Sequence, residues 1–470
     1  RQRQMCIRDR DYDLVVLGSG PAGEKGAVQA GYFGKKVAVI EAAPEPGGAC
    51  VHTGTLPSKT MREAALYLSG HLGRHIYGLT VALDRSEATP RMLSRKDAVR
   101  SLEVERIRAN LDRHRVTTLR GRGRFIDANT LEVSPPDAAP FRVTAEKVLV
   151  ATGSSPNRPS DVPFEDPSID DSDEILQIDR LPDRMIVLGA GVIGCEYACM
   201  FAALGTKVTL VEGRADVLPF VDREIAGELV RAMGELGIEL LTTVKHESVK
   251  RVSADALRVV LSNGHVWEGD RVLYCTGRNG NTRDLGLENV GIAADKRGAI
   301  TVDAYYRTSV PNVYAVGDCI GFPALASASM EQARVAVVHA FALGYKKAIG
   351  TLIPYGLYTI PEVSFVGMTE AEATASGRGF VIGRAKLEDS ARGKIQGVRR
   401  GLLKLIVARD DRTLLGVHLV GDGAADLVHI GQAIMTAGGG VDTLIEMVFN
   451  HPTLSETYKY AAYDALGKLA

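Results

Sequence analysis

Two segments of the chain carry the same arrangement: an apolar stretch, three spaced glycines, a run of small residues, a second apolar stretch and an acid. The first contains Gly18-Ser-Gly-Pro-Ala-Gly23 and ends at Glu41, and the second contains Gly189-Ala-Gly-Val-Ile-Gly194 and ends at Glu212. In a strand, turn, helix, strand unit, such glycines let the backbone approach a pyrophosphate at the helix N-terminus, and the acid accepts ribose hydroxyls. The repeat therefore predicts two dinucleotide-binding sites, of which one can hold a flavin and the other a nicotinamide.

Further elements follow from the pattern of apolar residues. Strands are expected at 12–17, 36–40, 116–126, 184–188, 207–211, 358–367, 401–408 and 414–420, and helices at 59–72, 91–114, 424–436 and 455–469. An apolar strand closes each repeat at a Thr-Gly pair, Thr152-Gly153 and Thr276-Gly277, and another delivers Asp318 to the carboxyl edge of a sheet. After about residue 350 the residue pattern changes to the alternation typical of strands, which indicates a separate α+β domain.

Charge and cysteine content exclude several classes of function. The chain has 56 Lys plus Arg against 57 Asp plus Glu, so no overall field attracts nucleic acid or an anionic membrane. The apolar run 185–205 contains glycines and Glu196, which favours a buried strand, a turn and a helix over a membrane span. The six cysteines show neither a disulfide framework nor the spacing of metal ligands, so we expect no metal and a reducing cytoplasm.

Together these residues resemble the pyridine nucleotide:disulfide oxidoreductase superfamily, from Tyr12 to Ala470. The pattern is similar to that of its soluble, flavin-containing NAD(P) transhydrogenases, which are relatives of dihydrolipoamide dehydrogenase. The resemblance implies FAD as cofactor, NAD and NADP(H) as substrates, and a homodimer or a higher homo-oligomer. It also implies an α/β fold with two Rossmann-like domains, one for FAD and one for NAD(P), and a C-terminal α+β dimerisation domain.

The sequence also indicates domain boundaries. We expect a disordered or non-native leader at 1–10, an FAD-binding domain at 11–155 that is completed by 279–348, an NAD(P)-binding domain at 156–278 and a dimerisation domain at 349–470.

Site residues can be assigned by their positions in the family pattern. The candidate FAD contacts are Gly18, Gly20, Gly23, Glu41, Gly47, Gly48, Cys50, Lys59, Gly123, Thr152, Gly153 and Asp318. The candidate nicotinamide dinucleotide contacts are Gly189, Gly191, Gly194, Glu212, Arg214 and Gly277. Lys59 matches the lysine beside the flavin N5, and Glu196 matches its carboxylate partner. Hydride transfer at N5 benefits from a fixed cation, and an unpaired buried ammonium would tend to lose its proton. The alternative is that Lys59 is a surface lysine at the start of a helix.

The redox motif of the family is incomplete in this chain. The family has two cysteines separated by four residues, whereas this chain has Cys50 and Thr55. A hydroxyl cannot cycle between thiol and disulfide, so a disulfide substrate has no relay. The flavin can still accept a hydride from one nicotinamide and return it to another, which is ping-pong transhydrogenation. Cys50 is then a packing residue or a reactive one.

Two features leave alternatives open. His451 and Glu456 match the acid/base pair that serves the dithiol in dihydrolipoamide dehydrogenases, on a loop that the family lends to the flavin of the partner subunit. Without a dithiol, His451 is a relic or orients substrate. Glu212 favours NAD, since a 2′-phosphate roughly 4 Å away would be repelled by a few kcal/mol at an effective dielectric of about 20, and Arg214 could offset this repulsion.

Four other functions fit the sequence less well. These are a dihydrolipoamide dehydrogenase-like enzyme that uses a distant cysteine, a diaphorase or NAD(P)H oxidase, a metal-ion reductase, and a noncatalytic flavoprotein that senses nucleotide redox state. The intact Lys59, Glu196 and glycine fingerprints argue against the last of these.

Overall fold

The computed structural model describes residues 10–70, 77 and 83–469, so nearly all of the expected leader lies outside the described residues. The chain divides into two compact units, each built from three segments. Unit 1 comprises residues 1–58, 96–157 and 277–350, and unit 2 comprises residues 59–95, 158–276 and 351–470. The domain boundaries expected from the sequence stay a prediction.

Unit 1 is organised around a sheet whose central strands are parallel. The strands of this sheet are β1 (Tyr12–Leu17), β2 (Val37–Glu41), β3 (Thr117–Arg120), β4 (Arg122–Asp127), β5 (Thr130–Ser134), β6 (Phe141–Val150) and β17 (Val313–Ala315). Unit 1 also contains a two-stranded sheet made of β7 (Ser154–Pro156) and β16 (Arg278–Gly280). Its helices are α1 (Pro21–Tyr32), α2 (Gly48–His52), α8 (Ala326–Ala340) and the 3-10 helices Leu287–Val290 and Gly317–Ile320. Helices α3 (Thr55–Leu68) and α5 (Arg85–Arg113) have residues in both units.

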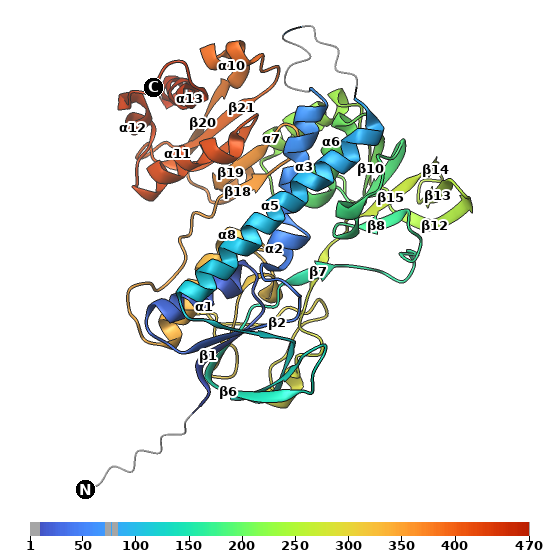
Figure 1. Cartoon of the computed structure of the whole chain (residues 1–470). Helices are drawn as coiled ribbons and strands as arrows, with labels where there is room; N and C mark the ends of the chain where they lie inside the picture. The colour runs from blue at the N-terminus through green and yellow to red at the C-terminus, as the bar shows by residue number, and fades with distance from the viewer. Residues whose placement is uncertain (1–9, 71–76, 78–82, 470) are drawn as a thin grey trace. The chain divides into compact units, whose positions relative to one another are not determined.

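The topology of unit 1 brings several loops to one edge. The sheet runs β3-β2-β1-β6-β5-β4, with β17 parallel to β6. Strands β1, β2, β3 and β6 are also parallel, and α1 packs beside α8 (Figure 1). Because parallel strands share a carboxyl edge, the loops after β1, β2, β6 and β17 meet there, which is where such sheets bind ligands.

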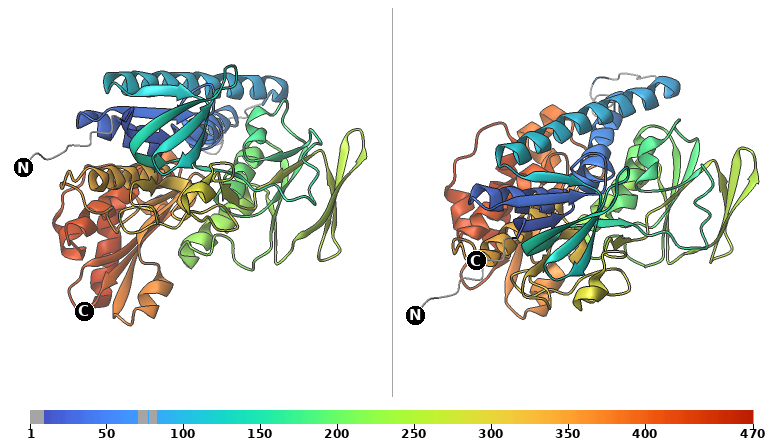
Figure 2. Two further views of the ribbon diagram at one scale, coloured as in Figure 1. Left: turned by 90° about the horizontal axis from the view of Figure 1, so that it is seen from below. Right: turned by 60° about the horizontal axis from the view of Figure 1, so that its bottom comes forward.

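Unit 2 contains a second parallel sheet, in the order β11-β10-β9-β15-β8. Its elements are β8 (Ile169–Asp171), a 3-10 helix (Glu174–Gln177), β9 (Arg184–Leu188), α6 (Val192–Ala203), β10 (Lys207–Glu212), α7 (Arg223–Glu235), β11 (Glu239–Thr242) and β15 (Arg271–Tyr274). A three-stranded antiparallel sheet projects beside it (Figure 2), made of β12 (His246–Ser253), β13 (Ala256–Leu261) and β14 (Val266–Gly269). Strand β9 lies between β10 and β15 as β1 lies between β2 and β6, so the predicted repeat is confirmed.

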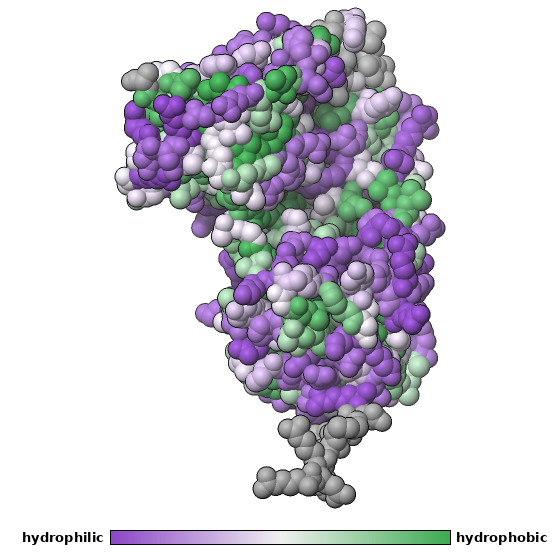
Figure 3. Space-filling view, turned by 90° about the vertical axis from the view of Figure 1, so that its left-hand side faces the viewer, coloured by the Kyte–Doolittle hydropathy of each residue, from purple (hydrophilic) through white to green (hydrophobic). Residues whose placement is uncertain are grey.

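The apolar run 185–205 forms β9, a turn and α6, as expected. Among the described residues, no helix is both long and apolar enough to cross a membrane. On the face drawn in Figure 3, hydrophobic residues form separate groups among hydrophilic ones.

The rest of unit 2 is an antiparallel sheet, in the order β18-β19-β22-β21-β20, with helices packed on it. Its strands are β18 (Tyr355–Leu357), β19 (Val363–Gly367), β20 (Phe380–Lys386), β21 (Leu402–Ala408) and β22 (Leu414–Val420). Its helices are α9 (Glu370–Ala375), α10 (Ala391–Gln396), α11 (Ala424–Thr436), α12 (Val441–Glu446), α13 (Thr457–Leu469) and the 3-10 helices Leu387–Asp389 and Leu454–Glu456.

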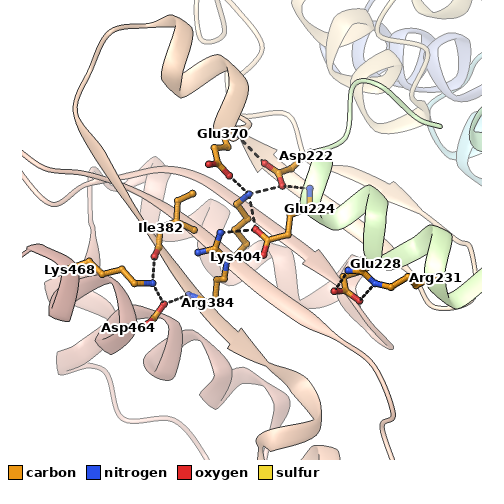
Figure 4. Close-up of polar contacts among 10 residues, drawn as sticks. All are labelled: Asp222, Glu224, Glu228, Arg231, Glu370, Ile382, Arg384, Lys404, Asp464 and Lys468. Atoms are coloured by element: carbon orange, nitrogen blue, oxygen red, sulfur yellow. Dashed lines mark hydrogen bonds and ion pairs between the residues drawn. The ribbon is translucent and has the colours of Figure 1, made fainter. Parts of the chain in front are cut away.

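A buried lysine joins this sheet to α7 (Figure 4). Lys404 of β21 is fully buried, and its Nζ lies 2.8 Å from Asp222 Oδ1, 2.6 Å from Glu370 Oε2 and 3.1 Å from Glu224 Oε2. Arg384 of β20 pairs with the same Glu224. Asp222 also caps α7 by accepting a hydrogen bond from the Glu224 N–H. One network of charges therefore fixes α7 against β20, β21 and α9.

Two expected strands are broken in the structure. The strand expected at 116–126 is split into β3 and β4 at Gly121, where φ is +152° and a Cβ would lie 2.8 Å from Ser134 O. The strand expected at 358–367 begins only at Val363, because residues 358–362 form a loop whose first N–H, that of Tyr358, bonds to Glu196.

Candidate functional site

The first and third glycines of both fingerprints are required by the fold itself. Gly18 and Gly189 have φ values of +95° and +108°. A Cβ at Gly23 would lie 1.9 Å from Gly18 O, and one at Gly194 would lie 1.9 Å from Gly189 O. These glycines let each helix pack against the turn that precedes it.

The second glycines are different, because no packing constraint explains them. A Cβ at Gly191 would meet nothing within 4 Å, and one at Gly20 would meet only Gly48 Cα, at 3.8 Å. Gly20 and Gly191 are the N-caps of α1 and α6, where backbone N–H groups and the helix dipole favour an anion. Open space at this point of both turns fits a pyrophosphate, so the residues present fit a dinucleotide in each unit.

Glu41 is held rigidly at the end of β2. Its Oε2 accepts hydrogen bonds from Ser19 N at 2.8 Å and Ser19 Oγ at 2.5 Å, and its Oε1 accepts one from Ala43 N at 2.8 Å. Ser19 Oγ in turn accepts one from Gly47 N at 3.1 Å. The sequence analysis missed Ser19, although its place inside the fingerprint was the available signal.

Asp318 lies at the same sheet edge, in the 3-10 helix after β17. Its Oδ2 accepts a hydrogen bond from Ser154 Oγ at 2.7 Å, and Arg278 Nε donates to that hydroxyl at 2.9 Å. Ser154 and Arg278 were not predicted, yet each directly follows a predicted Thr-Gly pair, at Gly153 and Gly277. This chain of polar groups fixes the Asp318 carboxylate.

The other residues predicted for unit 1 have distinct surroundings. The space beside Gly123 is filled by Leu17 and Ile40, so this glycine has a packing reason. Half-buried Cys50 lies in α2, while Thr55 is the exposed first residue of α3. The structure therefore has a hydroxyl, and no sulfur, at the position that the sequence analysis compared with the second cysteine of the family.

In unit 2, the Lys59 ammonium pairs with Glu196 of α6. Lys59 Nζ lies 2.6 Å from Glu196 Oε2, and the side chains are 25% and 9% exposed. The other carboxylate oxygen accepts a hydrogen bond from Tyr358 N at 2.8 Å, and the Tyr358 ring centre is 5.1 Å from Lys59 Nζ. The expected pair is thus formed, and a loop that was predicted as strand supports both members.

That loop is anchored to the helix that carries Lys59. Arg62, one turn further along α3, is buried, donates a hydrogen bond to Thr359 O at 3.1 Å and pairs with Glu362 at 3.3 Å. Lys59 and Arg62 are three residues apart and share one face of α3. The loop and the ammonium are therefore positioned by the same helix.

Glu212 and Arg214 form a two-point ion pair at the end of β10. Arg214 Nε donates to Glu212 Oε1 and Nη2 to Oε2, both at 3.0 Å. Glu212 also accepts hydrogen bonds from Arg214 N at 3.0 Å and Ala190 N at 3.1 Å. Burial works to raise the pKa of Glu212, but the bonds from Arg214 and Ala190 outweigh it and hold that pKa below its usual value. Arg214 already contacts the acid whose charge it was expected to offset.

His451 and Glu456 form the pair expected from the resemblance. His451 Nδ1 lies 3.0 Å from Glu456 Oε1, and the hydrogen bond from His451 lowers the pKa of that carboxyl. The His451 side chain is 68% exposed. Within the described part of the chain, no group of His, Cys, Asp and Glu residues could hold a metal ion.

The predicted residues thus fall into four groups. Unit 1 contains the first fingerprint, Glu41, Cys50, Thr55 and Asp318, and also Gly277. Unit 2 contains the second fingerprint with Glu212 and Arg214, and separately the Lys59–Glu196 and His451–Glu456 pairs. The roles of these residues in binding and catalysis stay predictions.

Comparisons with known proteins agree with this arrangement. Residues 12–340 match the family described as pyridine nucleotide-disulphide oxidoreductase, and residues 353–462 match its dimerisation domain. A Mycobacterium bovis protein (strain BCG / Pasteur 1173P2) named "Soluble pyridine nucleotide transhydrogenase" is 45% identical over 463 residues, 98% of each chain. A protein of the same name from Marinomonas sp. (strain MWYL1) is 40% identical over 463 residues, 98% of this chain and 99% of that one.

A solved structure shares the fold over nearly the whole chain. LpdA from Mycobacterium tuberculosis superposes with a TM-score of 0.88 at 29% identity, covering 96% of this chain and 98% of that chain. With two family matches that together span most of the sequence, and relatives above 40% identity over its length, the chain belongs to the pyridine nucleotide-disulphide oxidoreductase family.

Proposed function

We propose that this protein is an FAD-dependent pyridine nucleotide transhydrogenase, which moves a hydride between NADPH/NADP⁺ and NAD⁺/NADH by ping-pong exchange. The observation that carries this proposal is Thr55, the hydroxyl in place of the second redox sulfur. The relatives at 40–45% identity carry the name of the same activity.

No other described cysteine is suited to replace the missing thiol. Cys195, Cys199 and Cys319 are fully buried. Burial raises the pKa of Cys199 to about 12 and that of Cys319 to about 11, and it raises the pKa values of Cys195 and of the half-buried Cys275 well above their usual value. Such thiols stay protonated at neutral pH and are poor nucleophiles. These properties support a reaction that uses no dithiol.

The residues that would hold FAD are those of the first fingerprint with Glu41 and Asp318. The open N-cap at Gly20 suits the pyrophosphate, and the fixed Glu41 carboxylate suits the ribose hydroxyls. When bound, FAD supplies a two-electron carrier that takes a hydride from one nicotinamide and gives it to another.

Lys59 supplies a fixed positive charge to this reaction. Its ion pair with Glu196 holds the ammonium in place, and the hydrogen bond from the Tyr358 N–H holds the carboxylate. A hydride exchange moves no proton to or from a thiol, so we assign no step to His451 and Glu456.

Both nucleotides use the site of the second fingerprint in turn, and Glu212 discriminates between them. We expect Glu212→Ala to raise the affinity for NADP⁺ relative to NAD⁺ by about tenfold or more, since it removes a repelling carboxylate and releases Arg214. Titration of the purified holoenzyme with each nucleotide measures the ratio. Arg214→Met is the matched control and should shift the ratio the other way. An unchanged ratio in Glu212→Ala would show that the acid is not the discriminator.

The proposal includes a homodimer in the cytoplasm. The match of residues 353–462 to the dimerisation domain of the family supports the assembly. Exposed apolar side chains on this domain, among them Val448 at 93% exposure, are available for an interface.

An anaerobic assay with NADPH and thio-NAD⁺ tests the proposed activity, because it excludes both oxygen and thiols as acceptors. We expect rapid formation of thio-NADH. If the flavin is bleached by NADPH but no thio-NADH forms, the electrons have another acceptor, and an oxidase, a diaphorase or a redox sensor becomes the better description.

The same assay tests whether sulfur takes part. We expect Cys50→Ser to keep the wild-type rate of thio-NADH formation, since no dithiol carries the electrons. Cys319→Ser is a control for a buried cysteine of the same unit. A large loss of rate in Cys50→Ser, with FAD still bound, would give Cys50 a reactive role and contradict the proposed route.

A further inference from the structure

The segment that follows β11 is fastened to the turn that carries Glu212 and Arg214. Val244 N donates a hydrogen bond to Glu212 O, and Thr243 N donates one to Arg214 O, both at 3.0 Å. Lys245 comes next, and its own N–H bonds to Ser262 Oγ at 3.0 Å. The backbone of Lys245 is therefore held beside the turn that carries Glu212 and Arg214.

The Lys245 side chain lies along the residue between Glu212 and Arg214. A Cβ built on Gly213 would lie 3.1 Å from Lys245 Cε, 3.2 Å from Cγ and 3.7 Å from Cδ. Three successive carbons of the lysine thus follow the Gly213 backbone, and the ammonium is one bond further. A side chain at position 213 would displace the lysine stem by a few tenths of an ångström.

Lys245 supplies a positive charge that the Glu212–Arg214 pair does not. Glu212 and Arg214 neutralise each other through two hydrogen bonds, so the pair offers a 2′-phosphate no net attraction. Lys245 is exposed, and among the described residues no carboxylate forms an ion pair with it. Its ammonium is therefore an exposed positive charge next to the turn that carries Glu212 and Arg214.

We propose that Lys245 binds the 2′-phosphate of NADP(H) and thereby lets a site that keeps the NAD-type acid Glu212 accept both nucleotides. This inference rests on the proposed function for the use of NADP(H), and it concerns binding alone. Lysine binds phosphate as a point charge, so it adds affinity for NADP(H) without requiring Glu212 to be lost.

Equilibrium titration of the holoenzyme with NADP⁺ and with NAD⁺ tests the proposal. We expect Lys245→Met, which keeps the apolar stem on Gly213, to weaken NADP⁺ binding about tenfold and to leave NAD⁺ binding unchanged. Lys245→Arg should retain most of the NADP⁺ affinity. Gly213→Ala, which displaces the stem but keeps the charge, should weaken NADP⁺ binding less than Lys245→Met does. Lys250→Met, on β12, removes an exposed lysine elsewhere in the unit and should change neither affinity.

Salt provides a second readout. NADP⁺ affinity should fall more steeply with ionic strength in the wild type than in Lys245→Met, because the variant lacks one ionic contact. Equal weakening of both nucleotides, an unchanged ratio, or a wild type that does not bind NADP⁺ would overturn the inference. A wild type that binds NADP⁺ with the expected Lys245 dependence but forms no thio-NADH would refute the proposed activity and leave this inference standing.

Discussion

Replacing Lys59 with methionine is expected to slow reduction of the bound FAD by NADPH by about a hundredfold. The Lys59 ammonium is held by a 2.6 Å ion pair to Glu196, whose second oxygen is bonded by Tyr358 N at 2.8 Å. A charge fixed in this way costs little reorganisation when negative charge develops nearby, and methionine fills similar volume without it. Stopped-flow absorbance of the flavin under anaerobic conditions measures the rate.

Two controls separate this effect from a loss of structure. The FAD content per chain of Lys59→Met should equal that of the wild type. Glu196→Gln keeps the lysine charge and an oxygen for the Tyr358 N–H, so it should slow the reaction less than Lys59→Met does. Wild-type rates in Lys59→Met would remove the lysine from hydride transfer.

The parts of the fold that the sequence predicted are those set by local patterns. Strands β1 and β9, the glycine turns and the acids at Glu41 and Glu212 all lie within two short repeated segments. The break at Gly121 was missed because it depends on an approach to Ser134 O, in another strand. The loop at 358–362 was missed because Tyr358 N bonds to Glu196, 162 residues away, while the sequence alternates like a strand.

In the candidate site, too, the features set by local spacing could be predicted from the sequence, and those that depend on distant segments could not. Glu41 and its fingerprint could be predicted from spacing, whereas the pairing of Lys59 with Glu196, 137 residues apart, came from the family resemblance. Ser154 and Lys245 carry no motif of their own. Their importance depends on which segments the sheet edges bring together, and single-sequence periodicity contains no information about that.

The contacts of Lys404 also join segments that are distant in the sequence. Its replacement by methionine is expected to lower the free energy of unfolding by about 3–5 kcal/mol. The Lys404 and Asp222 side chains are each 1% exposed, and removal of the lysine leaves the buried Asp222 carboxylate without a cationic partner. Thermal unfolding of the holoenzyme should show the loss as a Tm lower by roughly 5–10 °C. The double variant Lys404→Met with Asp222→Asn should recover part of it, because it removes the unpaired charge.

The pH dependence separates this charge effect from a simple packing defect. Burial works to raise the pKa of Asp222 and of Glu224, but hydrogen bonds from Lys404 to Asp222 and from Arg384 and Lys404 to Glu224 hold both pKa values below their usual ones. Burial likewise works to lower the pKa of Lys404, and Asp222 and Glu370 raise it overall.

The carboxylates therefore stabilise the fold above their unfolded pKa of about 4, and this contribution is lost as the pH falls through their lower folded values. The lysine stabilises the fold below its unfolded pKa of about 10.4, and this contribution is lost as the pH rises through its higher folded value. The difference in Tm between wild type and Lys404→Met should thus be largest near neutral pH and shrink below about pH 4. A difference that stays constant with pH would show that Lys404 acts through its packed volume and not through its charge.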